Sequence, residues 1–247
     1  MATVIQYQSG MSNGFFVEEN GSVIAVDGGA LLGSEYTKKA LDDAGIMPEQ
    51  IRLLVITHGH VDHFVNMDEL RKLTGAPLLC HEKSRLTLEE ARLPTVFPRN
   101  QVGRKVDAFR IEMTRLHGEP VPYLPPMKPD LTWAGTFDLA PYGIHGRIIE
   151  TPGHSDSDTS VVLDDRQAIV GDLLVNDEFT DGVPTLAYFG YDPDPAKANE
   201  LLFPSCHRLL ELADTFYSGH GGPFSRADME NALRSAEEEA AQTTTAY

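Results

Sequence analysis

One short run of this 247-residue sequence is dense in metal-binding side chains, Thr57-His58-Gly59-His60-Val61-Asp62-His63. Imidazole and carboxylate groups are the donors that proteins offer to zinc, iron and manganese. The glycine at position 59 lets the backbone turn sharply between the first two imidazoles. We interpret the run as one loop that serves two metal ions, with His58 and His60 facing the first ion and Asp62 and His63 facing the second.

Three later segments repeat a pattern in which an apolar run is followed by a polar residue beside glycine. They are Thr151-Pro152-Gly153-His154-Ser155, Val170-Gly171-Asp172-Leu173 and Tyr217-Ser218-Gly219-His220-Gly221-Gly222. A single His or Asp beside glycine is most often a turn residue. Together with the first run, however, these segments complete a set of donors for two ions.

With its donors in the order His-x-His-x-Asp-His, His, Asp and His, the sequence resembles the metallo-β-lactamase-fold superfamily from Asp27 to His220. The resemblance implies an α/β (α+β) fold, a four-layer αββα sandwich with the metal site at one edge of the sheets. It also implies that Asp27 supports the metal loops. The implied ligands of the two divalent ions are His58, His60 and His154 for the first, Asp62, His63 and His220 for the second, and Asp172 as a bridge.

This ligand set predicts a reaction. Two cations that share a water lower its pKa towards neutrality, and they stabilise a developing oxyanion. We therefore predict a binuclear, zinc-type hydrolase in which a metal-bridging hydroxide attacks an ester-type bond of a lactone, a thioester or a related small molecule. Zn²⁺ is the expected ion, with Fe and Mn as alternatives. Asp62 and Asp172 are the candidate catalytic carboxylates, and no Ser or Cys nucleophile is required.

Two other functions stay open. His58, His154 and Asp172 also form a two-His-one-carboxylate set, which suits mononuclear non-haem iron and O₂ chemistry, and persulfide dioxygenases of the superfamily resemble that case. The complete second donor set favours the hydrolase. The other alternative is a non-catalytic binding module, although unneeded buried His and Asp residues would cost stability.

Substrate contacts are expected beyond the metal ligands. Tyr188 and Tyr191 follow Asp172 along the chain and carry phenols that can reach a substrate oxygen, and Asn176 is a third candidate. Packing of the two aromatic rings is the competing interpretation. β-Lactams and phosphoesters remain alternative substrates.

The charge of the chain restricts its partners. With 20 Lys and Arg residues against 37 Asp and Glu residues, the formal net charge is −17, which disfavours nucleic acid and anionic membrane surfaces. The stretch from Lys83 to Lys128 differs, because its nine basic and five acidic residues give +4 and leave −21 for the rest. This basic stretch and the metal ions favour a small and anionic substrate.

The elements that position these residues are predicted as short strands and intervening helices in a single domain, residues 1–247. The strands are expected at 15–17 and 23–26, joined by a turn at Asn20-Gly21, and at 51–56, 77–80, 131–137, 143–150, 160–163, 168–170 and 215–217. Helices are expected near 34–44, 67–73, 84–92, 195–213 and 225–240. This order favours sheets covered by helices over a single parallel sheet.

The segment 93–130 is predicted to be an insertion, because it holds seven of the sixteen prolines. Within it an apolar stripe at helical spacing predicts a helix, formed by Val102, Val106, Phe109, Met113 and Leu116. Packing of this stripe on the protein's own core is the favoured interpretation. A lid over the site and a homodimer contact are the alternatives.

No apolar run approaches the roughly 18 residues that span a bilayer, and the first residues lack the pattern of a secretory signal. We therefore expect a cytoplasmic protein. Its two cysteines, Cys80 and Cys206, are expected to be free thiols.

Overall fold

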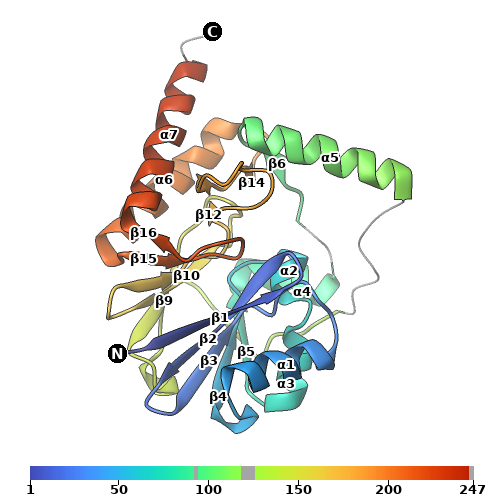
Figure 1. Cartoon of the computed structure of the whole chain (residues 1–247), viewed down its shortest axis with the longest axis vertical. Helices are drawn as coiled ribbons and strands as arrows, with labels where there is room; N and C mark the ends of the chain where they lie inside the picture. The colour runs from blue at the N-terminus through green and yellow to red at the C-terminus, as the bar shows by residue number, and fades with distance from the viewer. Residues whose placement is uncertain (92–93, 118–125, 245–247) are drawn as a thin grey trace.

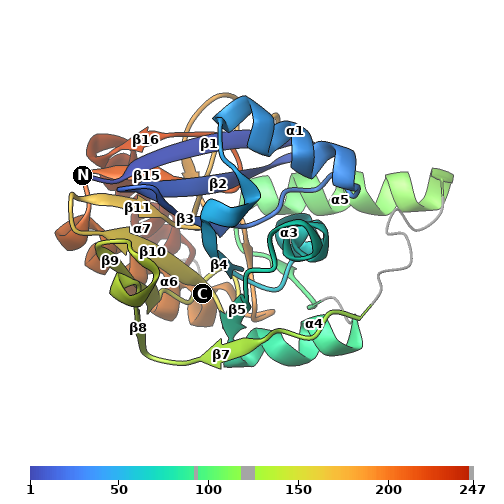
Figure 2. The ribbon, with the colours of Figure 1, turned by 90° about the horizontal axis from the view of Figure 1, so that it is seen from below.

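The computed structural model describes residues 1–91, 94–117 and 126–244 and consists of four layers, as predicted. Two six-stranded sheets pack face to face. The helices α1 (Ser34–Ala44) and α3 (Met67–Thr74) cover the outer face of one sheet, and α6 (Pro195–Leu212) and α7 (Arg226–Thr244) cover the other (Figures 1 and 2). The αββα arrangement follows from strands that bury side chains on both faces.

The first sheet begins with an antiparallel meander and continues with parallel strands. Its order is β1 (Thr3–Ser9), β2 (Ser12–Glu19), β3 (Ser22–Val26), β4 (Ile51–Val55), β5 (Leu78–His81) and β7 (Leu131–Trp133). The predicted turn joins β2 to β3, with positive φ angles of 51° at Asn20 and 82° at Gly21. Those angles match the twist of a tight hairpin, which explains the strength of the Asn-Gly signal.

The second sheet presents three strand ends along one edge. Its order is β16 (Phe224–Ser225), β15 (Thr215–Tyr217), β11 (Gln167–Ile169), β10 (Thr159–Leu163), β9 (Gly146–Glu150) and β8 (Thr136–Asp138). Strands β9 and β11 are both antiparallel to β10, and β15 is parallel to β11. The carboxyl ends of β9, β11 and β15 therefore point the same way.

The prediction of a single strand at 131–137 is wrong. Residues 131–133 form β7 beside β5 in the first sheet, whereas 136–138 form β8 beside β9 in the second. Gly135 lies between them with a φ of +80°, a left-handed conformation that glycine adopts without strain. The chain thus turns at this glycine and passes from one sheet to the other.

Alternation along the strands divides the core into layers. On β2, Phe15 and Val17 lie in the cluster between the two sheets, and Phe16 lies in the cluster beneath α1 and α3. A third cluster joins the second sheet to α6 and α7 and includes the buried free thiol Cys206. Each fully buried large apolar side chain contributes roughly 1.5–3 kcal/mol, so these clusters hold the strand ends in register.

The inserted segment begins close to the second half of the chain. Strand β6 (Phe97–Pro98) pairs with β14 (Phe189–Gly190). The next residue, Arg99, is buried, and its guanidinium donates to the carbonyl of Ala187 at 2.5 Å and to Oδ1 of Asn199 at 2.8 Å. These contacts fix the start of helix α5 (Gln101–His117), which then extends away from the body (Figure 1).

The helix predicted from the apolar stripe is confirmed, but core packing of its outer half is wrong. Val102 and Val106 are partly buried, whereas Phe109 and Leu116 are 53% and 56% exposed. The stripe leaves the core because the helix points outward. Residues 93 and 118–125 of the insertion lie outside the described residues.

The remaining short elements are the helices α2 (Val61–Phe64) and α4 (Arg85–Glu90), three 3₁₀ turns (Pro48–Gln50, Glu82–Ser84 and Ala140–Tyr142), and the paired strands β12 (Leu174–Val175) and β13 (Thr185–Leu186).

Across the described ranges, no helix combines the length and the apolar character that crossing a membrane requires.

Candidate metal centre

Strand ends deliver the candidate ligands to one edge of the sandwich. His58 and His60 follow β4, and Asp62 and His63 lie in the one-turn helix α2 just beyond them. The other three candidates follow strands of the second sheet, with His154 after β9, Asp172 after β11 and His220 after β15. Two backbone hydrogen bonds tie these loops together, from Thr159 N to Thr57 O at 3.0 Å and from Gly219 N to Gly171 O at 2.9 Å.

The first group of donors is formed by three imidazoles and a carboxylate. Nδ1 of His60 lies 3.0 Å from Nε2 of His58 and 2.8 Å from Nε2 of His154. Imidazole nitrogens at about 2.1 Å from one tetrahedral ion stand about 3.4 Å apart, so these three converge near the required spacing. With Asp172 they form a group whose donor atoms lie within 4.8 Å of one another.

The second group consists of Asp62, His63 and His220, again with donor atoms within 4.8 Å of one another. Asp172 lies between the groups. Its Oδ2 is 3.3 Å from Nε2 of both His63 and His220, and it is 3.6 Å from Nε2 of His154. The structure therefore brings all seven predicted ligands together, and Oδ2 of Asp172 lies within 3.3–3.7 Å of imidazole nitrogens from both groups.

Hydrogen bonds on the outer side of four histidines select the tautomer that binds metal. A ring nitrogen that donates to an acceptor leaves the other nitrogen with a lone pair. In each of the four, Nδ1 is next to an acceptor and Nε2 faces the cluster. The acceptors are Thr57 Oγ1 for His58 (3.0 Å), Asp27 Oδ2 for His63 (2.9 Å), Phe189 O for His154 (3.3 Å) and Met11 O for His220 (2.9 Å).

Asp27 supports both groups, which deepens the role that the resemblance implied. Its fully buried carboxylate accepts from Thr57 N at 2.8 Å, from Thr57 Oγ1 at 2.7 Å and from His63 Nδ1 at 2.9 Å. Because Thr57 Oγ1 gives its proton to Asp27, its lone pairs are free to accept from His58. One carboxylate thus orients His63 directly and His58 through Thr57. This role of Thr57 was not predicted from the sequence.

The fit of these residues to cations rests on atoms that are buried and unpaired. Nε2 of His63 and Oδ1 of Asp172 are inaccessible to solvent and have no hydrogen-bond partner. Such atoms each cost about 1–3 kcal/mol unless something satisfies them. A divalent ion accepts electron pairs from imidazole and carboxylate alike, so the donor set fits two ions.

The electrostatics of the site also favour cations. Burial lowers the pKa of His58 and lowers the pKa of His60 to about 3, so both rings are neutral. Burial opposes charge on His63 too, but Asp172 and Asp62 outweigh it and raise the pKa of that imidazole. Burial likewise opposes charge on Asp172, yet His63 and His220 lower its pKa. Ionised carboxylates in a buried site attract positive charge, and divalent ions compete with protons for the same nitrogens.

A serine motif lies close to the cluster but serves it structurally. Residues Gly10 to Gly14 match the Gly-x-Ser-x-Gly pattern of serine hydrolases, which acts at a strand-to-helix turn. Here the central Ser12 opens β2 and is only 1% exposed. Its hydroxyl donates to the carbonyl of Asp62 at 2.7 Å. Ser12 therefore holds the metal loop and is no candidate nucleophile.

Replacing Gly219 with alanine is expected to weaken the second metal site. A Cβ at this position would lie 2.3 Å from Oδ1 of Asp172 and 2.4 Å from Cε1 of His63, so both ligands would have to move. We expect metal affinity to fall by about 10- to 100-fold, as it does when the residues that orient metal ligands are replaced. Titration with a competing chelator measures this change. Unchanged affinity of both ions in a folded variant would contradict it.

The three predicted substrate contacts occupy different places. A cavity of about 330 Å³ opens onto the cluster, and Tyr188 lines it while donating its hydroxyl to Oδ2 of Asp177 at 2.6 Å. Tyr191 is absent from the described lining of that cavity and donates to the carbonyl of Lys197 at 3.1 Å. The amide oxygen of Asn176 accepts from the Thr180 hydroxyl at 2.9 Å. Only Tyr188 among the three borders the cavity.

Comparisons with known proteins agree with this geometry. Residues 8–240 match the family model described as the metallo-beta-lactamase superfamily. The chain is 25% identical over 214 residues, 85% of each protein, to the probable metallo-hydrolase YqgX of Bacillus subtilis (strain 168).

Two solved structures illustrate the likeness in fold. The BLEG-1 B3 metallo-beta-lactamase has a TM-score of 0.63 and 20% identity, with 93% of this chain and 97% of that chain covered. TTHA1623, solved in a di-iron-bound form, has a TM-score of 0.57 and 19% identity, with 93% and 98% covered. At these identities the two structures show the shared fold.

Proposed function

Because the chain belongs to the metallo-beta-lactamase superfamily, we propose that it is a binuclear metal-dependent hydrolase of small molecules with an ester-type bond. The observation that carries the proposal is the position of Asp172. Its carboxylate lies within 3.3–3.7 Å of imidazole nitrogens from both donor groups. One carboxylate shared by two complete groups favours two ions that act on a single bond.

When bound, two divalent ions would supply a water-derived nucleophile at neutral pH and would polarise the carbonyl oxygen of the substrate. His58, His60 and His154 are the residues that would hold the first ion, and Asp62, His63 and His220 those that would hold the second. The chain contributes their orientation. Hydrogen bonds from the outer nitrogens keep the rings fixed, so little reorganisation is needed during the reaction.

The cavity indicates the size and polarity of the substrate. A volume of about 330 Å³ lies at the small end of the range for ligand sites and suits a small molecule. Its walls include Val61, Val175, Ala187 and Phe189, which are apolar. Such walls can pack against an acyl or alkyl group. A lactone or a thioester with a short apolar body meets these requirements.

A mononuclear iron dioxygenase is the second candidate, and its donors would be His58, His154 and Asp172. The intact second group, Asp62, His63 and His220, supports the hydrolase over this alternative. Zn²⁺ is the ion we propose. Iron stays in the comparison because TTHA1623, a structural neighbour, was solved with two iron ions.

Metal analysis followed by a substrate panel tests the proposal. Protein purified without added metal should contain about two ions per chain, and it should hydrolyse at least one lactone or thioester from a panel that also holds β-lactams and phosphoesters. A single iron with O₂ consumption would support the dioxygenase instead. Two bound ions without turnover of any panel member would favour a binding module.

A further inference from the structure

The inserted segment forms part of the wall of the metal-site cavity. Pro94, Val96 and Arg110 come from this segment and line the cavity together with metal ligands such as His60 and His154. Helix α5, which carries Arg110, leaves the body of the molecule beyond this point (Figure 1). The insertion therefore contributes directly to the space that a substrate would occupy.

Arg110 brings a permanent positive charge to this wall. Among the described residues that line the cavity, it is the one Lys or Arg. Its Nη2 donates to Oδ1 of Asp107 at 2.8 Å, and its side chain remains 57% exposed. A guanidinium has five N–H donors in a planar fork, and this bond uses one of them. The remaining donors suit an oxyanion of a bound molecule.

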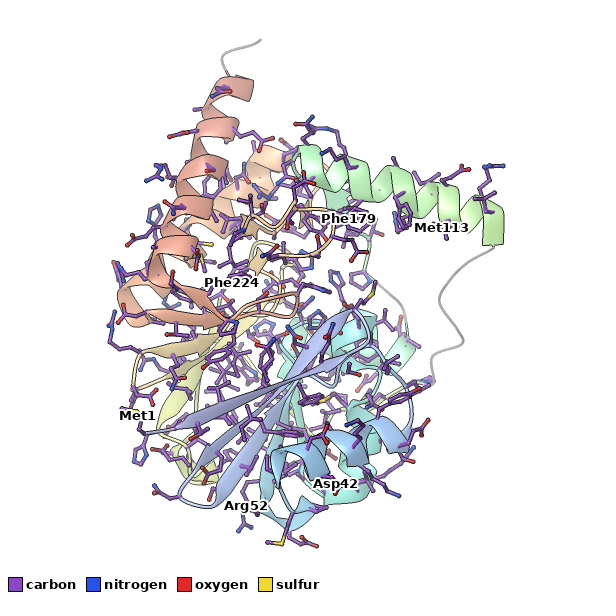
Figure 3. All side chains as sticks on the ribbon, viewed as in Figure 1. Met1, Asp42, Arg52, Met113, Phe179 and Phe224 are labelled. Carbon is purple, nitrogen blue, oxygen red and sulfur yellow. The ribbon has the colours of Figure 1, made fainter. Side chains whose placement is uncertain are left out.

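Contacts along α5 position the helix backbone that carries Arg110. A Cβ at Gly103 would lie 2.1 Å from the carbonyl oxygen of Tyr188, so the helix backbone packs directly on the cavity wall. The ring of Phe109 lies 5.5 Å from the ring of Phe179, measured between centroids. Figure 3 shows Phe179 against the middle of α5, with Met113 farther out along the helix. The residue before Arg110 thus contacts Phe179, although Phe109 itself is 53% exposed.

We propose that Arg110 binds a carboxylate or similar oxyanion on the substrate, at a position remote from the bond that the metal centre hydrolyses. This inference rests on the proposed function and narrows its substrates to small apolar esters that carry an anionic group. Because the guanidinium is more than half exposed, water screens part of its charge, and the attraction depends on its directed hydrogen bonds. A guanidinium also pairs with a carboxylate through two parallel hydrogen bonds, which a neutral ester cannot match.

A matched pair of esters tests the proposal. Mono-4-nitrophenyl glutarate carries a free carboxylate, and its methyl ester has the same hydrolysable bond without the charge. With the metal-loaded enzyme, Arg110→Gln should raise KM for the charged ester by about 5- to 10-fold and leave kcat within about threefold. The neutral ester should change by no more than about twofold. Arg110→Lys should restore part of the affinity for the charged ester.

Arg115→Gln is the control variant. Arg115 lies on the same helix and pairs with Glu112, three residues earlier, as Arg110 pairs with Asp107. It is 66% exposed and is not among the described residues that line the cavity. This substitution removes the same charge and should leave both esters unaffected. Equal effects of the two glutamine variants, or an equal loss for both esters in Arg110→Gln, would overturn the proposal.

A binding measurement separates this proposal from the proposed function. Glutaric acid monoanilide has an amide in place of the ester, and calorimetry can follow its binding without turnover. If the anilide binds more weakly to Arg110→Gln than to the unaltered protein, the anion site is supported. This holds even if neither ester is hydrolysed. Failure to hydrolyse the esters would reject the proposed ester hydrolase but not the anion site. Equal binding to both proteins would overturn the assignment of Arg110.

Discussion

Asp172→Ala is expected to abolish hydrolysis and to remove at least one metal ion per chain. The carboxylate is the donor that both groups share, and its Oδ2 lies 3.3 Å from Nε2 of His63 and of His220. Without it, the five imidazoles would hold two ions with only Asp62 as a counter-charge. Metal ions supply several kcal/mol of transition-state stabilisation, so activity should fall by at least about 10³-fold. Metal content and kcat/KM are the measurements.

Three further variants, Asp172→Asn, Asp164→Ala and Asp62→Ala, test whether the loss is due to the charge of Asp172. The amide keeps the volume of Asp172 but loses its charge, so the same loss of metal is expected with little change in stability. Asp164→Ala is the control, because Asp164 is 63% exposed and its nearest described charged partner is Arg147 at 4.0 Å. Two ions and full activity in Asp62→Ala would defeat the binuclear mechanism.

Asp27→Ala is expected to destabilise the fold and the metal centre together. The side chain is fully buried, and its removal leaves Thr57 N, Thr57 Oγ1 and His63 Nδ1 without their common acceptor. Breaking a buried, hydrogen-bonded charged group costs roughly 3–5 kcal/mol. Denaturant unfolding of the metal-free protein measures this loss without a contribution from bound ions.

Asp27→Asn separates orientation from stability. Thr57 N, Thr57 Oγ1 and His63 Nδ1 all donate to the carboxylate of Asp27. An asparagine amide has one oxygen and one NH₂, so in either orientation its NH₂ faces at least one of these donors. If the amide faces His63, Nδ1 must accept, and the proton moves to Nε2, where it blocks metal binding. We expect a folded variant whose affinity for the second ion falls by about 10- to 100-fold. Full affinity for both ions would show that Asp27 has a structural role alone.

The sequence indicated the ligands because each donor follows a strand end. The mostly apolar run at 51–56 is too short for a typical helix and is rich in β-branched residues, so it indicated a buried strand whose following residues emerge at a sheet edge. Glycine beside a donor marked the tight loops. The family resemblance then supplied the pairing of His154, Asp172 and His220, which local patterns left open.

The path of the chain between the sheets was less predictable. An apolar stripe specifies a helix but not what the helix packs against, so the outward course of α5 did not follow from Val102 to Leu116. The sequence also did not show which strands would pair at residues 131–137, where the chain turns at Gly135 and passes to the other sheet. Arg110 was counted only as part of a basic stretch, because nothing local shows which arginine of a helix reaches a cavity.

The sequence by itself determined which metal-binding side chains this protein carries, since donor types and their order along the chain are covalent facts. Tertiary structure decided how that chemistry is organised. It placed Asp172 between two groups, gave each of four histidines an acceptor for its outer nitrogen, and set Arg110 in the cavity wall. These features depend on distances between residues far apart in the chain. Such distances are set by the packing of two sheets and an outward helix, and no local pattern encodes them.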